Sequence, residues 1–151
     1  MRDQHKGDAP IVVHPNFVLE DDLPGFIRSA NCFISPTRGE GFGLPGLQSM
    51  ACGIPVIITD TSGCKDYANA ETCTLMYPDI VLHKSMDHIP QFSNKRWTQV
   101  SVTKIKDTMR HVLNSQKEIS LKAEIARDYV ERNFSFSCIT NNFSRILSDL
   151  L

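Results

Sequence analysis

A glycine-rich loop that carries one carboxylate is the segment of this chain best suited to chemistry. Residues 37–43 read TRGEGFG, and they lie between a short apolar run and a segment with the pattern of a helix that begins near Leu44. Glycines allow a backbone to approach a ligand closely. Because the first amides of a helix have no partner within it and lie at the positive end of its dipole, this loop predicts an anion site suited to phosphate.

Glu40 adds a second kind of recognition to this loop. A carboxylate repels phosphate, so we expect Glu40 to face hydroxyl groups, and the hydroxyls of a sugar are the obvious partner. The amides of Gly43, Leu44 and the loop glycines would bind the phosphate. Arg38 could contact a diphosphate, pair with Glu40, or remain a solvated loop charge.

The elements that must position this loop alternate between short strands and helices. Apolar runs predict four strands, at residues 11–14, 32–35, 55–59 and 73–77. Among them we expect one helix after Asp22 and another from Leu44 to Cys52. Residues 78–100 have weak periodicity and predict a long loop with room for a short element, whereas the C-terminal third has the periodicity of helices.

This alternation predicts a single α/β domain over residues 1–151. Its centre would be a parallel sheet with helices on both faces, and the C-terminal helices would pack across it. In such a sheet ligands bind beyond the carboxyl ends of the strands, where the TRGEGFG loop is expected to lie.

The composition excludes several classes of partner and site. A formal net charge of −1 over 151 residues argues against nucleic acid or an anionic membrane as the main partner. The five cysteines form no CxxC pair and no zinc-like cluster, so we expect reduced thiols, a cytoplasmic protein and no metal site. No apolar run approaches the roughly 20 residues that a transmembrane helix needs.

A dinucleotide site is the alternative that the same loop raises. Residues 41–46 match the pattern GxGxxG, and Asp60 follows the next expected strand, where a ribose-binding acid would lie. Three features disfavour this interpretation. The fingerprint unit is usually the first βαβ unit of its domain, and here an expected strand and helix precede it. Five residues separate the strand from Gly41, although the fingerprint turn is tight, and Pro45 occupies the stretch that should enter the helix.

Residues 35–57, SPTRGEGFGLPGLQSMACGIPVI, resemble the signature of family 4 (group 1) glycosyltransferases. The resemblance implies a GT-B fold, in which two Rossmann-like domains face each other across a cleft. This chain would be the C-terminal, nucleotide-sugar-binding domain. The implied reaction is a retaining transfer of a sugar from a nucleotide-diphosphate sugar to an acceptor hydroxyl, with no metal and no cofactor.

The resemblance also implies roles for individual residues. Glu40 matches the first glutamate of the family pattern Glu-x7-Glu and would be the catalytic residue at the donor sugar. Position 48 would face the nucleotide ribose, and here Gln48 replaces the second glutamate, which removes charge-assisted hydrogen bonds. Backbone amides would contact the sugar and the diphosphate, and they belong to Gly41, Phe42, Gly43 and Leu44.

The resemblance covers only part of a GT-B enzyme. The basic pair that grips the diphosphate in relatives and the N-terminal acceptor domain have no counterpart in these 151 residues. We therefore expect a fragment, a truncated gene product or one half of a split enzyme, with the N-terminal domain in the same or another chain. A non-catalytic nucleotide-sugar-binding or regulatory module of the same fold is the alternative.

Overall fold

A three-stranded parallel sheet forms the centre of the molecule, as the sequence predicts. The computed structural model describes residues 9–82, 90 and 96–150. The sheet has the order β1-β2-β3, with β1 at Phe33–Ser35, β2 at Val56–Thr59 and β3 at Thr74–Met76. Ile34 lies opposite Ile57 in the first pair, and Ile58 lies opposite Leu75 in the second.

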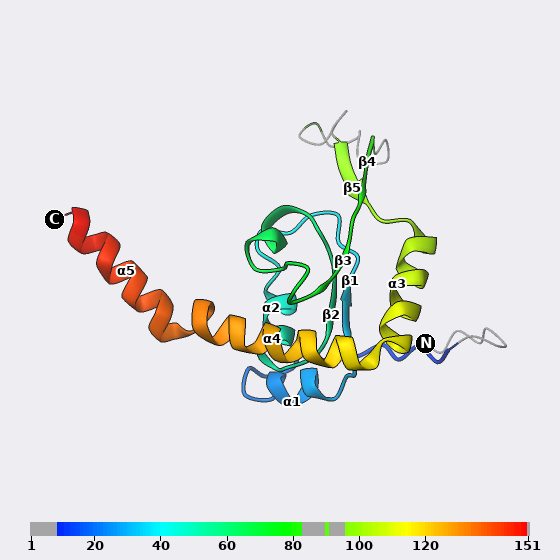
Figure 1. Cartoon of the computed structure of the whole chain (residues 1–151), viewed down its shortest axis with the longest axis horizontal. Coiled ribbons are helices and arrows are strands. Elements are labelled where there is room, and N and C mark those ends of the chain that lie inside the picture. Colours follow the sequence, from blue (N-terminus) through cyan, green and yellow to red (C-terminus); the bar gives the residue numbers. More distant parts are fainter. Residues whose placement is uncertain (1–8, 83–89, 91–95, 151) are drawn as a thin grey trace.

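Helices cover both faces of this sheet (Figure 1). The described residues form five α-helices: α1 at Leu23–Arg28, α2 at Leu44–Ala51, α3 at Val102–Asn114, α4 at Gln116–Phe134 and α5 at Phe136–Leu150. Helices α2 and α4 pack on one face, and α3 packs beside β3 on the other. The predicted α/β architecture is therefore confirmed.

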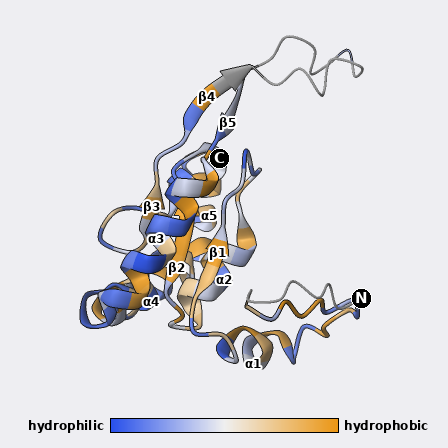
Figure 2. Ribbon diagram, turned by 90° about the vertical axis from the view of Figure 1, so that its right-hand side faces the viewer, coloured by the Kyte–Doolittle hydropathy of each residue, from blue (hydrophilic) through white to orange (hydrophobic). Residues whose placement is uncertain are grey.

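Strand β2 is the apolar centre on which both layers meet. All four of its residues are buried, and Figure 2 shows its hydrophobic character. Side chains alternate between the faces of a strand, so Val56 and Ile58 enter the cluster with α2 and α4, whereas Ile57 enters the cluster with Val100. Its first three residues are apolar because neither face meets water, and the buried Thr59 ends the strand.

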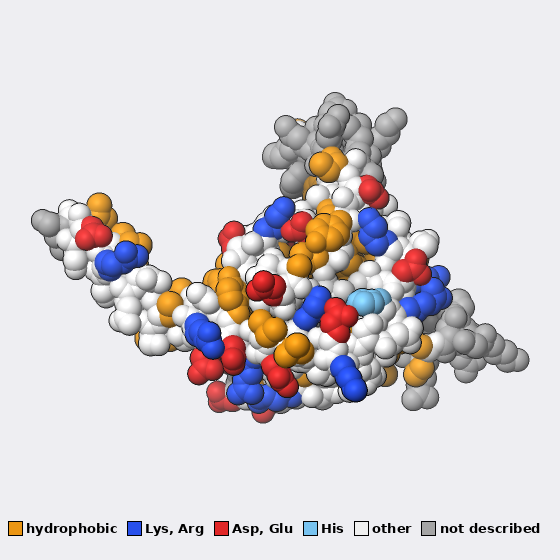
Figure 3. All heavy atoms as spheres, in the orientation of Figure 1, with side chains coloured by type: hydrophobic (Ala, Val, Ile, Leu, Met, Phe, Trp, Pro, Cys, Tyr) orange, Lys and Arg blue, Asp and Glu red, His pale blue; other side chains and the backbone are white. Residues whose placement is uncertain are grey.

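Helix α4 contacts α2 through a narrow apolar stripe. Its buried residues recur at helical spacing: Ile119, Ala123, Ala126 and Val130. The two alanines allow the helices to approach closely, and Ala126 is almost fully buried. The opposite face of α4 is charged, and Figure 3 shows acidic and basic side chains interspersed on the visible surface.

The sequence prediction was wrong at residues 11–14, which form no strand in the structure. The side chains of Ile11, Val12 and Val13 are 75%, 89% and 69% exposed. A β-branched run becomes a strand only when another strand accepts its backbone hydrogen bonds. Within the described part of the chain no strand pairs with this run.

The predicted loop at residues 78–100 has a strand near each end, and the two strands pair as a hairpin. Strand β4, Asp79–Leu82, pairs antiparallel with β5, Arg96–Gln99, and Asp79 lies opposite Gln99. The pair projects beyond the carboxyl ends of β1, β2 and β3 (Figure 1), an edge that we call the mouth of the sheet. The local pattern is weak because each strand is short and its partner is far along the chain.

Helix α5 corrects a second prediction, because it does not pack across the sheet. It contacts α4 and then projects away from the domain (Figure 1). Ser135, between the two helices, has an extended backbone (φ −65°, ψ 153°) that redirects the chain. The apolar residues of α5 stay exposed: Phe136, Ile139, Phe143, Ile146, Leu147 and Leu150.

Candidate functional site

The TRGEGFG loop leaves β1 at the mouth of the sheet and leads into α2. Gly43 is the N-cap of α2 and adopts a left-handed backbone with φ 83°, which favours glycine. A Cβ at this position would lie 2.7 Å from Cys64 Sγ and 2.9 Å from Tyr67 Oη. The Tyr67 hydroxyl donates a hydrogen bond of 2.6 Å to the Gly43 carbonyl, so it fixes the start of the helix.

The backbone amides at this helix start are available to a ligand. Among the described residues, none accepts a hydrogen bond from the amides of Gly41, Phe42, Gly43 or Leu44. These four amides are the ones that the sequence assigns to the sugar and the diphosphate. Because such amides carry partial positive charge at the start of a helix, they could bind an anion, and that site stays a prediction.

Glu40 lies beside these amides, and its side chain is exposed to solvent. Its Cγ would be 3.7 Å from a Cβ at Gly43, so the carboxylate belongs to the same face as the start of α2. The Glu40 amide donates to Ser62 Oγ at 2.8 Å, and the Gly63 amide donates to the Glu40 carbonyl at 3.2 Å. The backbone of Glu40 is therefore fixed while its carboxylate remains open to a ligand.

Arg38 lies toward the β4–β5 hairpin. Its guanidinium donates to Gln99 Oε1 at 3.5 Å, and its carbonyl accepts a hydrogen bond from the Thr98 hydroxyl. Within the described residues Arg38 forms no ion pair with Glu40. The Arg38 side chain is exposed, and contact with a diphosphate stays a prediction.

Comparison with known proteins now assigns the family. Residues 1–87 match the family model described as "Glycosyl transferases group 1". The chain belongs to the group 1 glycosyltransferases. The family resemblance of residues 35–57 is thereby confirmed, and the loop that carries Glu40 lies inside the matched region.

Curated relatives of this glycosyltransferase chain are similar over a short region. O-antigen chain mannosyltransferase B of Escherichia coli is 41% identical over 46 residues, which are 30% of this chain and 12% of the relative. D-inositol 3-phosphate glycosyltransferase of Paenarthrobacter aurescens is 39% identical over 57 residues, 38% of this chain and 14% of the relative. This chain thus matches only about an eighth of the length of these relatives.

Solved structures show the same fold over most of this chain. HepE of Anabaena, solved in complex with UDP-glucose, aligns with a TM-score of 0.63 at 15% identity, over 85% of this chain and 30% of HepE. Sucrose-phosphate synthase of Thermosynechococcus elongatus aligns with a TM-score of 0.62 at 20% identity, over 83% of this chain and 26% of that one. The likeness establishes a Rossmann-like domain of the GT-B type.

The side chains of Phe42 and Gln48 have other surroundings in this glycosyltransferase domain. The Phe42 ring packs against Tyr67 and Phe134, with centroid distances of 5.4 Å and 6.1 Å, so only its amide is available to a ligand. Gln48 is exposed one turn into α2 and lines a cavity of about 300 Å³ between α1, β1 and α2. Its contact with a ribose stays a prediction.

Sequence reasoning missed Ser62, Gly63 and Tyr67. Ser62 contacts Glu40, and Tyr67 contacts Gly43, across more than 20 residues of sequence, so no local pattern indicates these contacts. Burial raises the pKa of the Tyr67 hydroxyl, and the negative charge of Glu40 acts in the same direction. Tyr67 consequently stays protonated and keeps donating to Gly43 at neutral pH.

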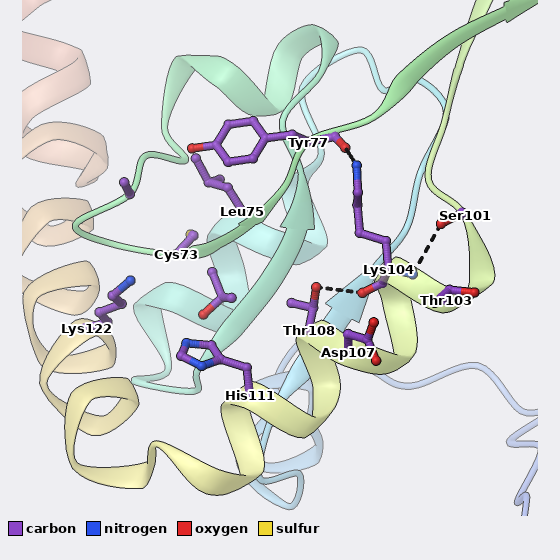
Figure 4. Close-up of a pocket in the computed structure, with 12 residues that line it drawn as sticks. Cys73, Leu75, Tyr77, Ser101, Thr103, Lys104, Asp107, Thr108, His111 and Lys122 are labelled. Carbon is purple, nitrogen blue, oxygen red and sulfur yellow. Dashed lines mark hydrogen bonds between the residues drawn. The ribbon is translucent and has the colours of Figure 1, made fainter.

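A cavity of about 670 Å³ lies away from Glu40, between β3, α3 and α4 (Figure 4). Its basic groups already have partners: Lys104 Nζ donates to the Tyr77 carbonyl at 2.6 Å, and Lys122 pairs with Glu118 at 3.4 Å. No group of three or more His, Cys, Asp or Glu side chains in the described residues could hold a metal ion. None of the described helices is long and apolar enough to span a bilayer.

Proposed function

We propose that this domain binds the nucleotide-diphosphate sugar in a retaining, metal-independent transfer of the sugar to an acceptor hydroxyl. The observation that carries the proposal is the exposed Glu40 side chain. Its backbone is held by Ser62 and Gly63, beside four amides that have no hydrogen-bond acceptor among the described residues. Membership of the glycosyltransferase family and the similar fold of HepE, solved with UDP-glucose, support it.

Each part of the loop has a distinct role in this proposal. Glu40 positions the sugar and stabilises positive charge as the glycosidic bond breaks. The amides of Gly41, Gly43 and Leu44, together with the dipole of α2, stabilise the departing diphosphate, whose charge grows in the transition state. Neither role needs a cofactor.

Arg38 and Gln48 complete the donor site that we propose. Arg38 is exposed and would exchange its 3.5 Å contact with Gln99 for the diphosphate. Gln48 would hydrogen-bond the ribose hydroxyls as both donor and acceptor. These neutral bonds are roughly half as strong as those of a carboxylate, so we expect moderate affinity for the nucleotide.

A second Rossmann-like domain, in the same or another chain, would complete the enzyme. Three observations support this part of the proposal. Arg38 and Glu40 of the TRGEGFG loop are exposed to solvent, and so are the apolar residues of α5. This chain also covers only 26–30% of the length of the solved proteins that it resembles. Because the second domain would supply the acceptor site, we expect these 151 residues alone to bind donor weakly and to transfer little sugar. We expect the enzyme to act in the cytoplasm, where nucleotide sugars are available.

The test is a titration of wild type and Glu40→Ala with UDP, UDP-glucose, GDP and GDP-mannose, followed by NMR shifts. Because Glu40 would form charged hydrogen bonds to the sugar, we expect its loss to weaken the preferred nucleotide sugar by roughly 10- to 100-fold. The matching nucleoside diphosphate should change little. Glu124→Ala, an exposed glutamate on α4, is the control. Equal affinity of wild type and Glu40→Ala for every nucleotide sugar would contradict the donor site.

Gln48 favours one second candidate, a non-catalytic nucleotide-sugar-binding module. The distinguishing measurement is the release of free sugar and nucleoside diphosphate from a bound nucleotide sugar in the longer protein that contains this domain. Binding without any release or transfer would support the module. Transfer to an added hydroxyl acceptor would exclude it.

A further inference from the structure

The turn that follows β2 holds the backbone of Glu40 from both sides. Ser62 Oγ accepts the Glu40 amide at 2.8 Å, and the Gly63 amide donates to the Glu40 carbonyl at 3.2 Å. We propose that Ser62 is a positioning residue, which sets the place of the Glu40 carboxylate against the donor sugar. This inference rests on the proposed function and assigns a role to a residue outside the glycine-rich loop.

Ser62 has a backbone conformation that favours glycine, although the residue carries a side chain. Ser62 has φ 46°, and it is the one non-glycine residue with positive φ in the described part of the chain. Residues with a side chain rarely adopt this region, because Cβ approaches the backbone. Glycine would fit without strain but would leave the Glu40 amide without its partner. Strained residues of this kind gather at functional sites.

The turn after β2 packs closely against the loop that carries Glu40. A Cβ at Gly63 would overlap the carbonyl oxygen of Gly41 and would lie 2.8 Å from Phe42 Cα. The two backbones therefore touch directly. Movement of the Ser62 turn would carry the Glu40 loop with it.

The same short segment also fixes the other end of the loop. The 3-10 helix η1, Ser62–Asp66, leads into Tyr67, whose hydroxyl donates to the Gly43 carbonyl at 2.6 Å. Ser62 thus holds the backbone beside the carboxylate, whereas Tyr67 holds the backbone beside the helix amides. The separation between the sugar-binding carboxylate and the diphosphate-binding amides is set by a segment that need not touch either ligand group.

The experiment compares Ser62→Gly and Ser62→Ala with wild type in the full 151-residue chain. We titrate UDP, UDP-glucose, GDP and GDP-mannose, and we define the sugar increment as the affinity for a nucleotide sugar divided by that for its nucleoside diphosphate. Loss of one backbone hydrogen bond should lower the sugar increment about three- to tenfold in both variants. Affinity for the nucleoside diphosphate should change less than twofold, because Tyr67 still fixes the amides.

Thermal unfolding separates positioning from simple stabilisation. Ser62→Gly relieves the backbone strain, so its Tm should stay at or above the wild-type value while the sugar increment falls. Ser62→Ala keeps the strain and should have the lower Tm of the two. Ser115→Gly is the matched control, because it removes a serine hydroxyl whose contact, 3.3 Å to His111 Nδ1, lies at the α3–α4 junction, away from the mouth (Figure 1).

A double-variant cycle tests whether Ser62 acts through Glu40. In a Glu40→Ala background, Ser62→Gly should cause no further loss of the sugar increment. Additive losses, or an unchanged sugar increment in Ser62→Gly, would overturn this inference alone while donor binding by wild type stands. Absence of any nucleotide-sugar binding by wild type would instead overturn the proposed function and this inference with it.

Discussion

Gly39 and Gly41 of the TRGEGFG loop differ from Gly63, in the turn after β2, in the space that surrounds them. A side chain at Gly63 would overlap the backbone of Gly41, whereas a Cβ at Gly39 or Gly41 would meet nothing within 4 Å. Gly63 is therefore needed for the packing of the chain itself. The space beside Gly39 and Gly41 is open, and at Gly41 it leaves room for a ligand next to the amide.

Gly63→Ala should destabilise the domain by about 1–3 kcal/mol, because a backbone carbonyl has to move to admit the methyl group. Urea unfolding followed by circular dichroism measures this change. Gly39→Ala is the matched control and should stay within about 0.5 kcal/mol of wild type. A Gly63→Ala variant as stable as Gly39→Ala would show that the contact with Gly41 is looser than described.

Helix α2 is delimited at both ends by glycines with left-handed backbones. Gly43 begins it with φ 83°, and Gly53 follows its last turn with φ 72°. Pro45 occupies the first turn, where its missing amide hydrogen costs nothing. These local signals predict the helix from sequence, and they place its free amides at the mouth of the sheet.

Gly53→Ala should lower the free energy of unfolding by about 1 kcal/mol, because alanine is strained at this positive φ although space is available. Gly25→Ala, inside α1, is the opposite case: its Cβ meets nothing within 4 Å and its φ is not positive. Alanine there should stabilise by roughly 0.4–1 kcal/mol. Chemical denaturation of the two variants in parallel tests both signs, and a loss of stability in each would refute the backbone argument.

The β4–β5 hairpin contacts both the TRGEGFG loop and helix α3. Thr98 and Gln99 of β5 contact the backbone and the side chain of Arg38, respectively. Lys104 of α3 binds the Tyr77 carbonyl just before β4. The base of the hairpin is thus held at β5 by Arg38 and just before β4 by Lys104, next to the loop that carries Glu40.

At the scale of the whole molecule, the main cluster of apolar residues contains three groups that titrate at high pH. Tyr67, Cys64 and Cys73 are buried, and burial raises the pKa of each, that of Cys73 to about 11. In the unfolded chain these groups ionise at their ordinary values, about 8.5 for cysteine and 10 for tyrosine. The unfolded state therefore releases protons first as the pH rises.

Stability should consequently be full below about pH 8 and should fall as the pH rises through 9 to 11, by on the order of 1 kcal/mol per pH unit. Urea unfolding at pH 7.5, 9 and 10.5 measures this dependence. Tyr67→Phe removes one of the three groups, so its stability should fall less steeply above pH 10, whatever its value at pH 7.5. An equal slope in wild type and Tyr67→Phe would show that Tyr67 titrates normally.

The sequence by itself determined the strand–loop–helix–strand unit around Glu40 and the family to which it belongs. Local signals suffice there, because the proline and glycines of α2 and the apolar run of β2 restrict the backbone whatever surrounds them. An exposed Glu40 beside the amides that begin α2 follows from that unit. The role of Glu40 in sugar transfer stays a prediction.

Only the tertiary structure decided which distant segments meet. Two contacts join segments that no local pattern connects: Ser62 with Glu40, and β4 with β5. Two apolar segments are exposed in the structure, the run from Ile11 to Val13 and one face of α5. Their free energy comes from contacts between residues far apart in sequence, or from the absence of such contacts among the described residues. A local pattern reports which backbone a segment prefers, but not whether a neighbour is present to stabilise it.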